Sequence, residues 1–209
     1  MNLGVNAYGT DQELRALETW GLRFSPDVVL LQVYLDNDLE DIRHERRFSW
    51  PRPHYLLAGG DLRLIPPRKT WDVTLRTSSV LGEVFLRLLD RAIGRDRLAP
   101  AWESADSVPL FAALVRRIAG VAQREGAPLL VLLADAPDWV GPGIPPDRER
   151  RARDALAELG LPILDTGPLL EAAGEEAYGP HGHWSPRGHA LVAEAISGEI
   201  ESRGWLPDR

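Results

Sequence analysis

The sequence predicts an α/β domain built around a mostly parallel β-sheet. Three short apolar segments, residues 28–35, 128–133 and 161–164, have the composition of buried strands, and the first resembles a strand covered on both faces. Segments with helical periodicity separate them, and strands that alternate with helices are typical of βαβ units. The 209 residues suffice for a sizeable core, so we expect a single domain over residues 1–209.

The N-terminal region is expected to contribute a strand end and a helix. Residues 2–6 have the pattern of the end of a short strand. Thr10 is placed to cap a helix, with Glu13 in the capping-box position. The apolar face of that helix would consist of Leu14, Leu17 and Trp20.

Residues 43–75 are rich in arginine, proline and glycine and interrupt this pattern. Apolar segments at 55–57 and 62–65 flank two glycines, which predicts a small hairpin. We interpret the segment as an insertion in the same domain. Its arginines and Trp50 could bind an anionic or sugar substrate, but a solvated loop with one apolar anchor is the favoured interpretation.

The second half of the chain alternates helices and strands. Helical periodicity is present over residues 78–94, 107–124 and 147–159, around the second and third apolar strands. Ser185 is expected to cap the last helix, with Pro186 in its first helical position.

Composition narrows the possible partners. The net charge of −7 argues against nucleic acid or an anionic membrane as the main partner. The absence of cysteine excludes disulfides, thiolate catalysis and cysteine-based zinc sites.

No apolar run approaches the roughly 18 residues of a membrane span, and no signal peptide is visible. The sequence leaves the compartment and the oligomeric state open. No glycine-rich phosphate loop is present, and no cofactor is expected.

Three polar motifs lie where strands are expected to end. A turn at residues 6–8 follows the first strand, Asn37-Asp38 follows the strand at 28–35, and His183 precedes the last helix. In parallel sheets, catalytic groups lie in loops at the carboxyl ends of the strands. Ester hydrolysis through a serine needs a nucleophile, a base and oxyanion donors, and these motifs can supply the last two.

These motifs resemble three sequence blocks of the SGNH/GDSL hydrolases. Residues 2–12 resemble the second block, Asn37-Asp38 the third, and residues 181–184 the last, in the Asp-x-His-Trp form of one branch. The resemblance implies a three-layer α/β/α sandwich of flavodoxin-like style. Because the chain begins at the second block, we expect the first strand and helix of that fold to be missing.

The resemblance also implies roles. His183 would be the general base, Asn37 would donate its amide to the oxyanion, and the Ala7 N–H would be a second donor where the family has glycine. Asp38 would brace the Asn37 loop, and Trp184 would pack under the base. The implied site consists of the catalytic positions His183, Asn37, Ala7 and His181 and the substrate-lining residues Asn6, Tyr8, Asp38 and Trp184. No metal is expected, although His181, His183 and His189 could form a metal site as the less favoured alternative.

Two departures predict impaired catalysis. The family's Gly-Asp-Ser block is absent, and His181 stands where the family has the aspartate that orients the base. Glu175 or Glu176 could substitute for it. The internal serines that we considered lack a nucleophile-elbow context: Ser25, Ser78, Ser79, Ser107 and the expected cap Ser185.

We therefore expect an ester hydrolase whose substrates are small-molecule or carbohydrate acyl esters, including O-acetyl esters, with little or no activity in this chain. The alternative is a catalytically inactive module that binds carbohydrate or carboxylate, or a truncated fragment. Whether the chain is an enzyme stays open at this point.

Overall fold

A parallel three-stranded sheet forms the centre of the protein. The computed structural model describes residues 1–47, 50–93, 106–134, 136–137 and 144–206. The sheet has the order β1-β6-β7 and consists of β1 (Val29–Tyr34), β6 (Leu129–Ala134) and β7 (Ile163–Asp165). Both pairings are parallel, with Val29 opposite Leu129. The prediction of three strands in a mostly parallel sheet is thus confirmed, although only β6 is buried along its whole length.

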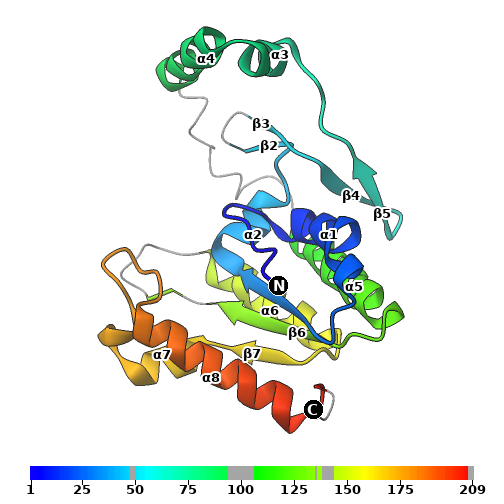
Figure 1. Ribbon diagram of the computed structural model, residues 1–209, viewed down its shortest axis with the longest axis vertical. Coiled ribbons are helices and arrows are strands. Elements are labelled where there is room, and N and C mark those ends of the chain that lie inside the picture. Colours follow the sequence, from blue (N-terminus) through cyan, green and yellow to red (C-terminus); the bar gives the residue numbers. More distant parts are fainter. Residues whose placement is uncertain (48–49, 94–105, 135, 138–143, 207–209) are drawn as a thin grey trace.

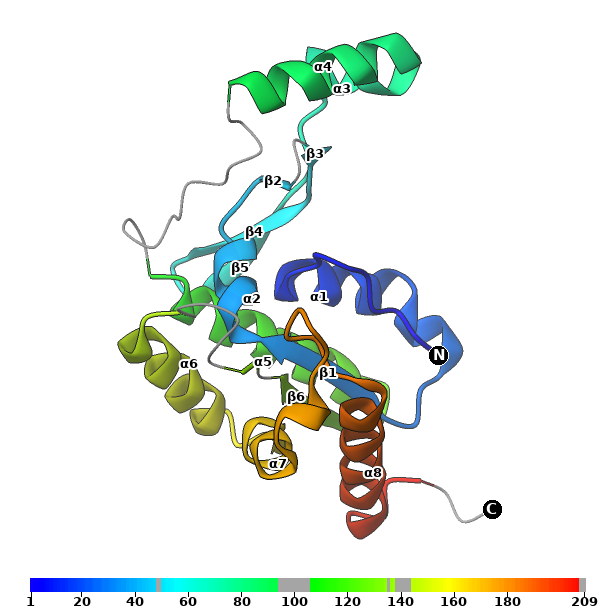
Figure 2. The ribbon, with the colours of Figure 1, turned by 90° about the vertical axis from the view of Figure 1, so that its left-hand side faces the viewer.

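Helices cover both faces of the sheet (Figures 1 and 2). One face packs against α1 (Thr10–Thr19), α5 (Val108–Arg124) and α6 (Pro146–Glu158), which form the main apolar core. A smaller cluster on the other face joins β6 to α7 (Gly167–Ala173), the short helix η4 (Glu175–Ala177) and α8 (Pro186–Ser202). The helices expected over 107–124 and 147–159 are present as α5 and α6, whereas α7 was not predicted.

Strand β1 is covered on one face only. Leu31 and Val33 are buried in the main core, whereas Leu30 is 44% exposed and Gln32 is exposed. The smaller cluster includes residues of β6 and β7 but none of β1. The expectation that residues 28–35 are buried on both faces is therefore wrong, because α7 and α8 cover only the other two strands.

Residues 2–6 do not form the expected strand. Their hydrogen bonds are local, since Gly4 N–H donates to Asn2 Oδ1 (2.8 Å) and Tyr8 N–H to the Val5 carbonyl (3.1 Å). Val5 is half exposed, so the segment buries too little apolar surface to offset the cost of ordering it as a strand.

Helix α1 begins one residue away from the predicted cap. Thr10 is its first helical residue and Gly9 is the N-cap, without a side-chain cap bond. Leu14 and Leu17 are buried as expected. Trp20 is 54% exposed, because α1 ends at Thr19 and the chain continues into the 3-10 helix η1 (Gly21–Phe24).

A short helix, α2 (Leu35–Asp41), follows β1 directly, where we expected a loop. Its start is tied back to the strand, because the Tyr34 N–H donates to Asp38 Oδ2 at 2.9 Å. Asp36 and Asp38 lie in its first turn, where negative charge is favourable to the helix dipole.

The inserted segment forms two hairpins. Short strands β2 (Arg46–Arg47) and β3 (Trp50–Pro51) pair first, and β4 (His54–Ala58) then pairs with β5 (Asp61–Ile65). The predicted hairpin is confirmed, and its turn uses Gly59 and Gly60 at positive φ. Tyr55 of β4 is buried in the main core and holds the second hairpin against it.

Two further helices extend away from the sheet (Figures 1 and 2). They are α3 (Trp71–Ser78) and α4 (Val80–Ala92). The helix predicted over 78–94 corresponds to α4, whereas α3 was not predicted. No helix in the described part of the chain is long and apolar enough to cross a membrane.

Candidate functional site

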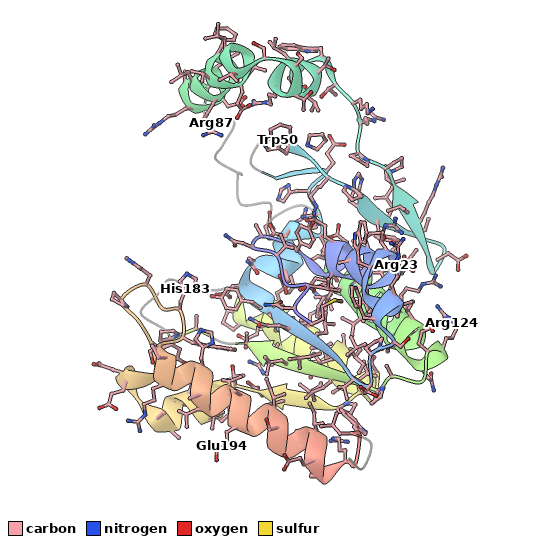
Figure 3. All side chains as sticks on the ribbon, in the orientation of Figure 1. Arg23, Trp50, Arg87, Arg124, His183 and Glu194 are labelled. Atoms are coloured by element: carbon pink, nitrogen blue, oxygen red, sulfur yellow. The ribbon has the colours of Figure 1, made fainter. Side chains whose placement is uncertain are left out.

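The predicted site motifs lie at one end of the sheet. Strands β1 and β6 run toward the end where α2 begins, and the loop before α8 lies at that same end (Figures 1 and 3). Figure 3 shows His183 on this loop. The arrangement is the one expected for catalytic loops in a parallel sheet.

The turn around Ala7 has an unusual backbone conformation. Ala7 has φ = +64°, in the left-handed region that glycine adopts without penalty. The turn closes through the Tyr8 N–H and the Val5 carbonyl, which leaves the Ala7 N–H without an acceptor among the described residues. Alanine can therefore occupy the position where the resemblance expects glycine.

The Ala7 turn lies beside α2. Gly9 packs so closely on that helix that a Cβ there would lie 3.1 Å from the Asp41 Cβ. The Asn37 side chain projects from the first turn of α2, and its Oδ1 is buried without a hydrogen-bond partner in the part of the chain that the structure describes. The segment after Ala7 thus packs on the C-terminal end of α2, and Asn37 lies one turn earlier on the same helix.

Asp38 is buried, with 4% of its surface exposed. Its carboxylate accepts the Tyr34 N–H, which ties α2 to the end of β1. This geometry favours the bracing role over direct contact with a substrate. Burial raises the pKa of Asp38 to about 8, against the effect of that hydrogen bond.

Asp38 belongs to a buried acidic cluster that joins α1 to α2. Burial raises the pKa of Asp11 to about 6, although its ion pair with the buried Arg52 lowers it. Burial and the nearby Asp38 and Asp11 raise the pKa of Glu13 well above its ordinary value. Like charges packed at low solvent exposure favour the protonated forms.

This acidic cluster is not predictable from the sequence alone. Arg52 lies 41 residues from Asp11, and nothing in the intervening sequence indicates that the two pair. In the sequence, the cluster is visible only as Asp11 and Glu13 in the first turn of a predicted helix. Acidic residues are common there because they interact favourably with the helix dipole, so they do not indicate a buried cluster.

The hydrogen bonds of Asp36 were also not predicted from the sequence. Its carboxylate accepts hydrogen bonds from the Tyr34 hydroxyl (2.7 Å) and from the Ile144 N–H (2.9 Å). The second bond connects α2 to the residue that precedes α6 by two positions, so Asp36 links two loops at the site end of the sheet.

The loop that carries His183 is a small closed turn. Tyr178 and Trp184 form a β-bridge, and the Gly179 N–H donates to the His183 carbonyl at 2.7 Å. His181 and His183 are both exposed, and no side-chain partner is found for either ring among the described residues. Trp184 meets the His189 ring edge-on at 5.5 Å, so helix α8 orients the tryptophan.

The base has no acidic partner in the described structure. His181 provides no carboxylate, and Glu176, one of the expected substitutes, instead pairs with Arg187. No contact that joins His183 to Asn37 or Ala7 is found among the described residues. The structure therefore places the segment after Ala7 against α2, while His183 lies separately at the same end of the sheet. The described residues contain no group of three or more ligands that could hold a metal ion.

The candidate serines are engaged elsewhere. Ser185 caps α8 as predicted, since its Oγ accepts the Gly188 N–H (3.2 Å) and donates to the Glu176 carbonyl (2.6 Å). Ser79 caps α4, Ser78 bonds to the Leu75 carbonyl, and Ser107 is buried. Ser25 ends η1 in the left-handed conformation.

No protein-family model, no curated protein sequence and no solved structure matches this chain.

Proposed function

We propose that this chain carries an acyl-ester site of the SGNH/GDSL type, suited to carbohydrate O-acetyl esters, in which hydrolysis is impaired. The observation that carries the proposal is the Ala7 turn, which lies against α2, the helix that carries Asn37. It combines a strained backbone position with an Ala7 N–H that has no acceptor and an Asn37 carboxamide whose buried Oδ1 has no donor among the described residues.

Strain at such a position supports a functional role. A non-glycine residue in the left-handed region costs about 1 kcal/mol or more, and it persists where the surrounding structure determines the conformation. The free Ala7 N–H and the Asn37 carboxamide are suitable donors for the oxygen of a tetrahedral intermediate. His183, exposed at the same end of the sheet, can accept the proton of an attacking group.

Impairment follows from the missing partners of these groups. Ser78, Ser79 and Ser185 are hydrogen-bonded, Ser107 is buried, and no carboxylate that orients His183 is found among the described residues. An oxyanion site without a working triad retains about 10³–10⁴-fold acceleration over water. We therefore expect slow ester hydrolysis in which His183 activates water.

The same two donors favour a second candidate function, in which the chain binds a carboxylate or an acetylated sugar without hydrolysing it. The Ala7 N–H and the amide N–H of Asn37 can each donate to a carboxylate or an ester carbonyl in the absence of a nucleophile. The experiment below distinguishes the two.

The test is p-nitrophenyl acetate hydrolysis by the full chain and by variants. We expect slow turnover that falls to background in His183→Ala and by about 10²-fold in Asn37→Ala, because one oxyanion donor contributes about that much. Gln123→Ala, which removes an exposed amide on α5, is the matched control and should not change the rate. His181→Asp should raise the His183-dependent rate by about tenfold or more, because an acidic partner orients the base.

Equal rates for the wild type, His183→Ala and Asn37→Ala would contradict hydrolysis at this site. If calorimetry then showed acetate or acetylated-sugar binding that Asn37→Ala abolishes, the binding function would stand in its place. If the wild type showed neither ester hydrolysis nor binding of acetate or an acetylated sugar, the proposed site would be rejected.

A further inference from the structure

Helix α4 has a broad apolar face that no part of the described chain covers. The exposed fractions of its side chains range from 36% for Leu89 to 83% for Val80. The face consists of Val80, Leu81, Val84, Phe85, Leu88 and Leu89. Contiguous apolar patches of this kind are rare on soluble proteins and mark interaction surfaces.

The exposed face lies opposite the side on which α4 packs. The apolar residues repeat with a spacing of three to four residues, which places them along one side of the helix. Gly82, Leu86 and Asp90 are buried on the other side, and a Cβ at Gly82 would lie 2.7 Å from the backbone oxygen of Leu75 in α3. Helix α3 therefore covers one side of α4 and leaves the other open.

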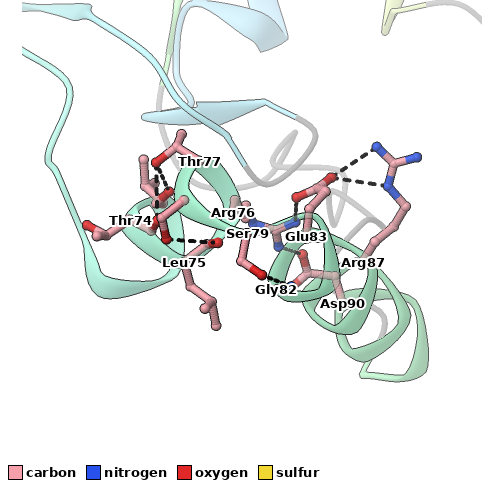
Figure 4. A network of polar contacts seen from close by, with 11 residues as sticks. Thr74, Leu75, Arg76, Thr77, Ser79, Gly82, Glu83, Arg87 and Asp90 are labelled. Carbon is pink, nitrogen blue, oxygen red and sulfur yellow. Dashed lines mark hydrogen bonds and ion pairs between the residues drawn. The ribbon is translucent and has the colours of Figure 1, made fainter.

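Charged contacts hold the two helices together on their inner side (Figure 4). Arg76 of α3 is buried and pairs with both Glu83 (2.9 Å) and Asp90 of α4, while Glu83 also pairs with Arg87 at 3.0 Å. Because the charges are satisfied between the helices, the apolar face of α4 is presented outward by a braced helical pair.

The charge of this region differs from that of the whole chain. Residues 66–93 contain five basic residues (Arg68, Lys69, Arg76, Arg87, Arg91) and three acidic ones (Asp72, Glu83, Asp90), a net charge of +2 in a chain of net charge −7. The acidity that argues against an anionic membrane surface is therefore located elsewhere in the chain.

An amphipathic groove borders the same face. Its volume is about 460 Å³, and it lies at the junction of α3 and α4. The side chains of Thr77, Ser78, Glu83 and Arg87 line it together with the apolar side chains of Val84 and Leu88, and Arg87 pairs there with Glu83. A groove with both polar and apolar groups suits the boundary between lipid headgroups and acyl chains.

We propose that α3 and α4 form an interfacial membrane anchor, in which the apolar face of α4 enters the boundary between headgroups and acyl chains of an anionic bilayer. Helices that lie in this boundary combine an apolar face of Leu and Phe with arginine at its polar edge. Trp71, 69% exposed at the start of α3, is a residue type enriched at that depth. With 13 residues, α4 is about 20 Å long and lies along the surface.

The flanking charge suits an anionic bilayer. Helices α3 and α4 together carry three basic and three acidic residues, so the net charge of +2 comes from Arg68 and Lys69, which are exposed just before α3 and which an anionic lipid surface would neutralise. This inference does not depend on the acyl-ester proposal, since it uses none of the same residues.

Co-sedimentation of the full chain with vesicles tests the anchor. Vesicles of phosphatidylglycerol and phosphatidylcholine in equal parts should bind the protein more tightly than pure phosphatidylcholine vesicles. Phe85→Glu/Leu88→Glu should weaken binding to both by at least about tenfold, because the two side chains leave the bilayer. Arg91→Gln should weaken binding to the anionic vesicles alone, by about fivefold.

The matched control is Leu56→Glu/Leu57→Glu on β4, which adds the same charge at two exposed leucines outside the helical pair. It should bind vesicles almost as the wild type does. Circular dichroism should show both double variants folded, because all four side chains are exposed. Absence of vesicle binding would overturn the proposal, as would equal losses in both double variants. Concentration-dependent dimers that Phe85→Glu/Leu88→Glu dissociates, without vesicle binding, would assign the face to a second copy.

Discussion

The φ angle of Ala7 strains the backbone and, for the same reason, supports a functional role for this turn. The value of +64° brings the alanine Cβ close to its own carbonyl, a clash that glycine avoids. The turn is nevertheless maintained by the Tyr8–Val5 hydrogen bond and by the close packing of Gly9 on α2. Its neighbours therefore determine the conformation.

Replacing Ala7 with glycine should stabilise the protein. We expect Ala7→Gly to raise the free energy of unfolding by about 0.5–1 kcal/mol, because the strain removed exceeds the added chain entropy of glycine. Ala16→Gly, in the interior of α1, is the matched control and should lower it by about 0.5–1 kcal/mol. Urea denaturation measures both, and a destabilised Ala7→Gly would show that the angle carries no strain.

At the level of elements, the strands of the parallel sheet and the long helices could be predicted, but the short helices could not. Strand β6 is a six-residue apolar run, β1 is one except for Gln32, and α5 repeats its apolar residues over 17 positions, so pattern alone identifies them. Helix α2 contains three aspartates and an asparagine, residues of low helix propensity, and it depends on the Asp38–Tyr34 bond and on buried Leu39. These tertiary contacts cannot be predicted from the local pattern of apolar residues.

For the candidate site as well, local features could be predicted and long-range contacts could not. The positions of Asn37 and His183 relative to the sheet could be predicted from strand ends and from the Ser185 cap. The pairing of Arg52 with Asp11 could not, because it joins residues 41 positions apart.

The start of α8 depends on a close backbone approach at Gly188. A Cβ at this position would lie 2.2 Å from the Ala177 carbonyl oxygen, which itself accepts the Ser185 N–H. We expect Gly188→Ala to destabilise the protein by more than about 2 kcal/mol, because backbone must move to admit the methyl group. The same change would disturb the loop that carries His183.

Gly198 offers a matched control on the same helix. No atom lies within 4 Å of a Cβ placed there, so Gly198→Ala should instead stabilise the protein by about 0.5–1 kcal/mol. Chemical denaturation of the two variants compares them directly. Similar effects of both substitutions would contradict the close approach at Gly188.

At the scale of the whole molecule, the buried acidic cluster couples stability to pH. The pKa of Asp38, about 8 in the folded chain, lies above the ordinary value of about 4 that applies when the chain unfolds. Between these values the folded chain binds more protons than the unfolded chain, so the free energy of unfolding should fall as the pH rises from about 4 to about 8.

Asp38→Asn should remove part of this pH dependence. Asparagine keeps an acceptor for the Tyr34 N–H but cannot ionise, so we expect a gain of about 1–3 kcal/mol relative to the wild type at pH 8 and little change near pH 4. Urea denaturation across this range measures the effect, with Asp61→Asn on the exposed hairpin as the control for loss of a charge. A slope unchanged by Asp38→Asn would assign the pH dependence to other groups.

Strand β1 pairs with β6 on one side only, so it is an edge strand at which a further strand could be added. The Val29 N–H donates to the Pro128 carbonyl, so the alternation of a strand turns the amides of Leu30 and Gln32 toward the outer edge. That edge is six residues long, whereas the opposite edge, β7, has three. A long edge with its hydrogen-bonding groups and Leu30 uncovered is a template for an incoming strand. Recruitment of a further strand, from this chain or from another, would therefore begin at β1.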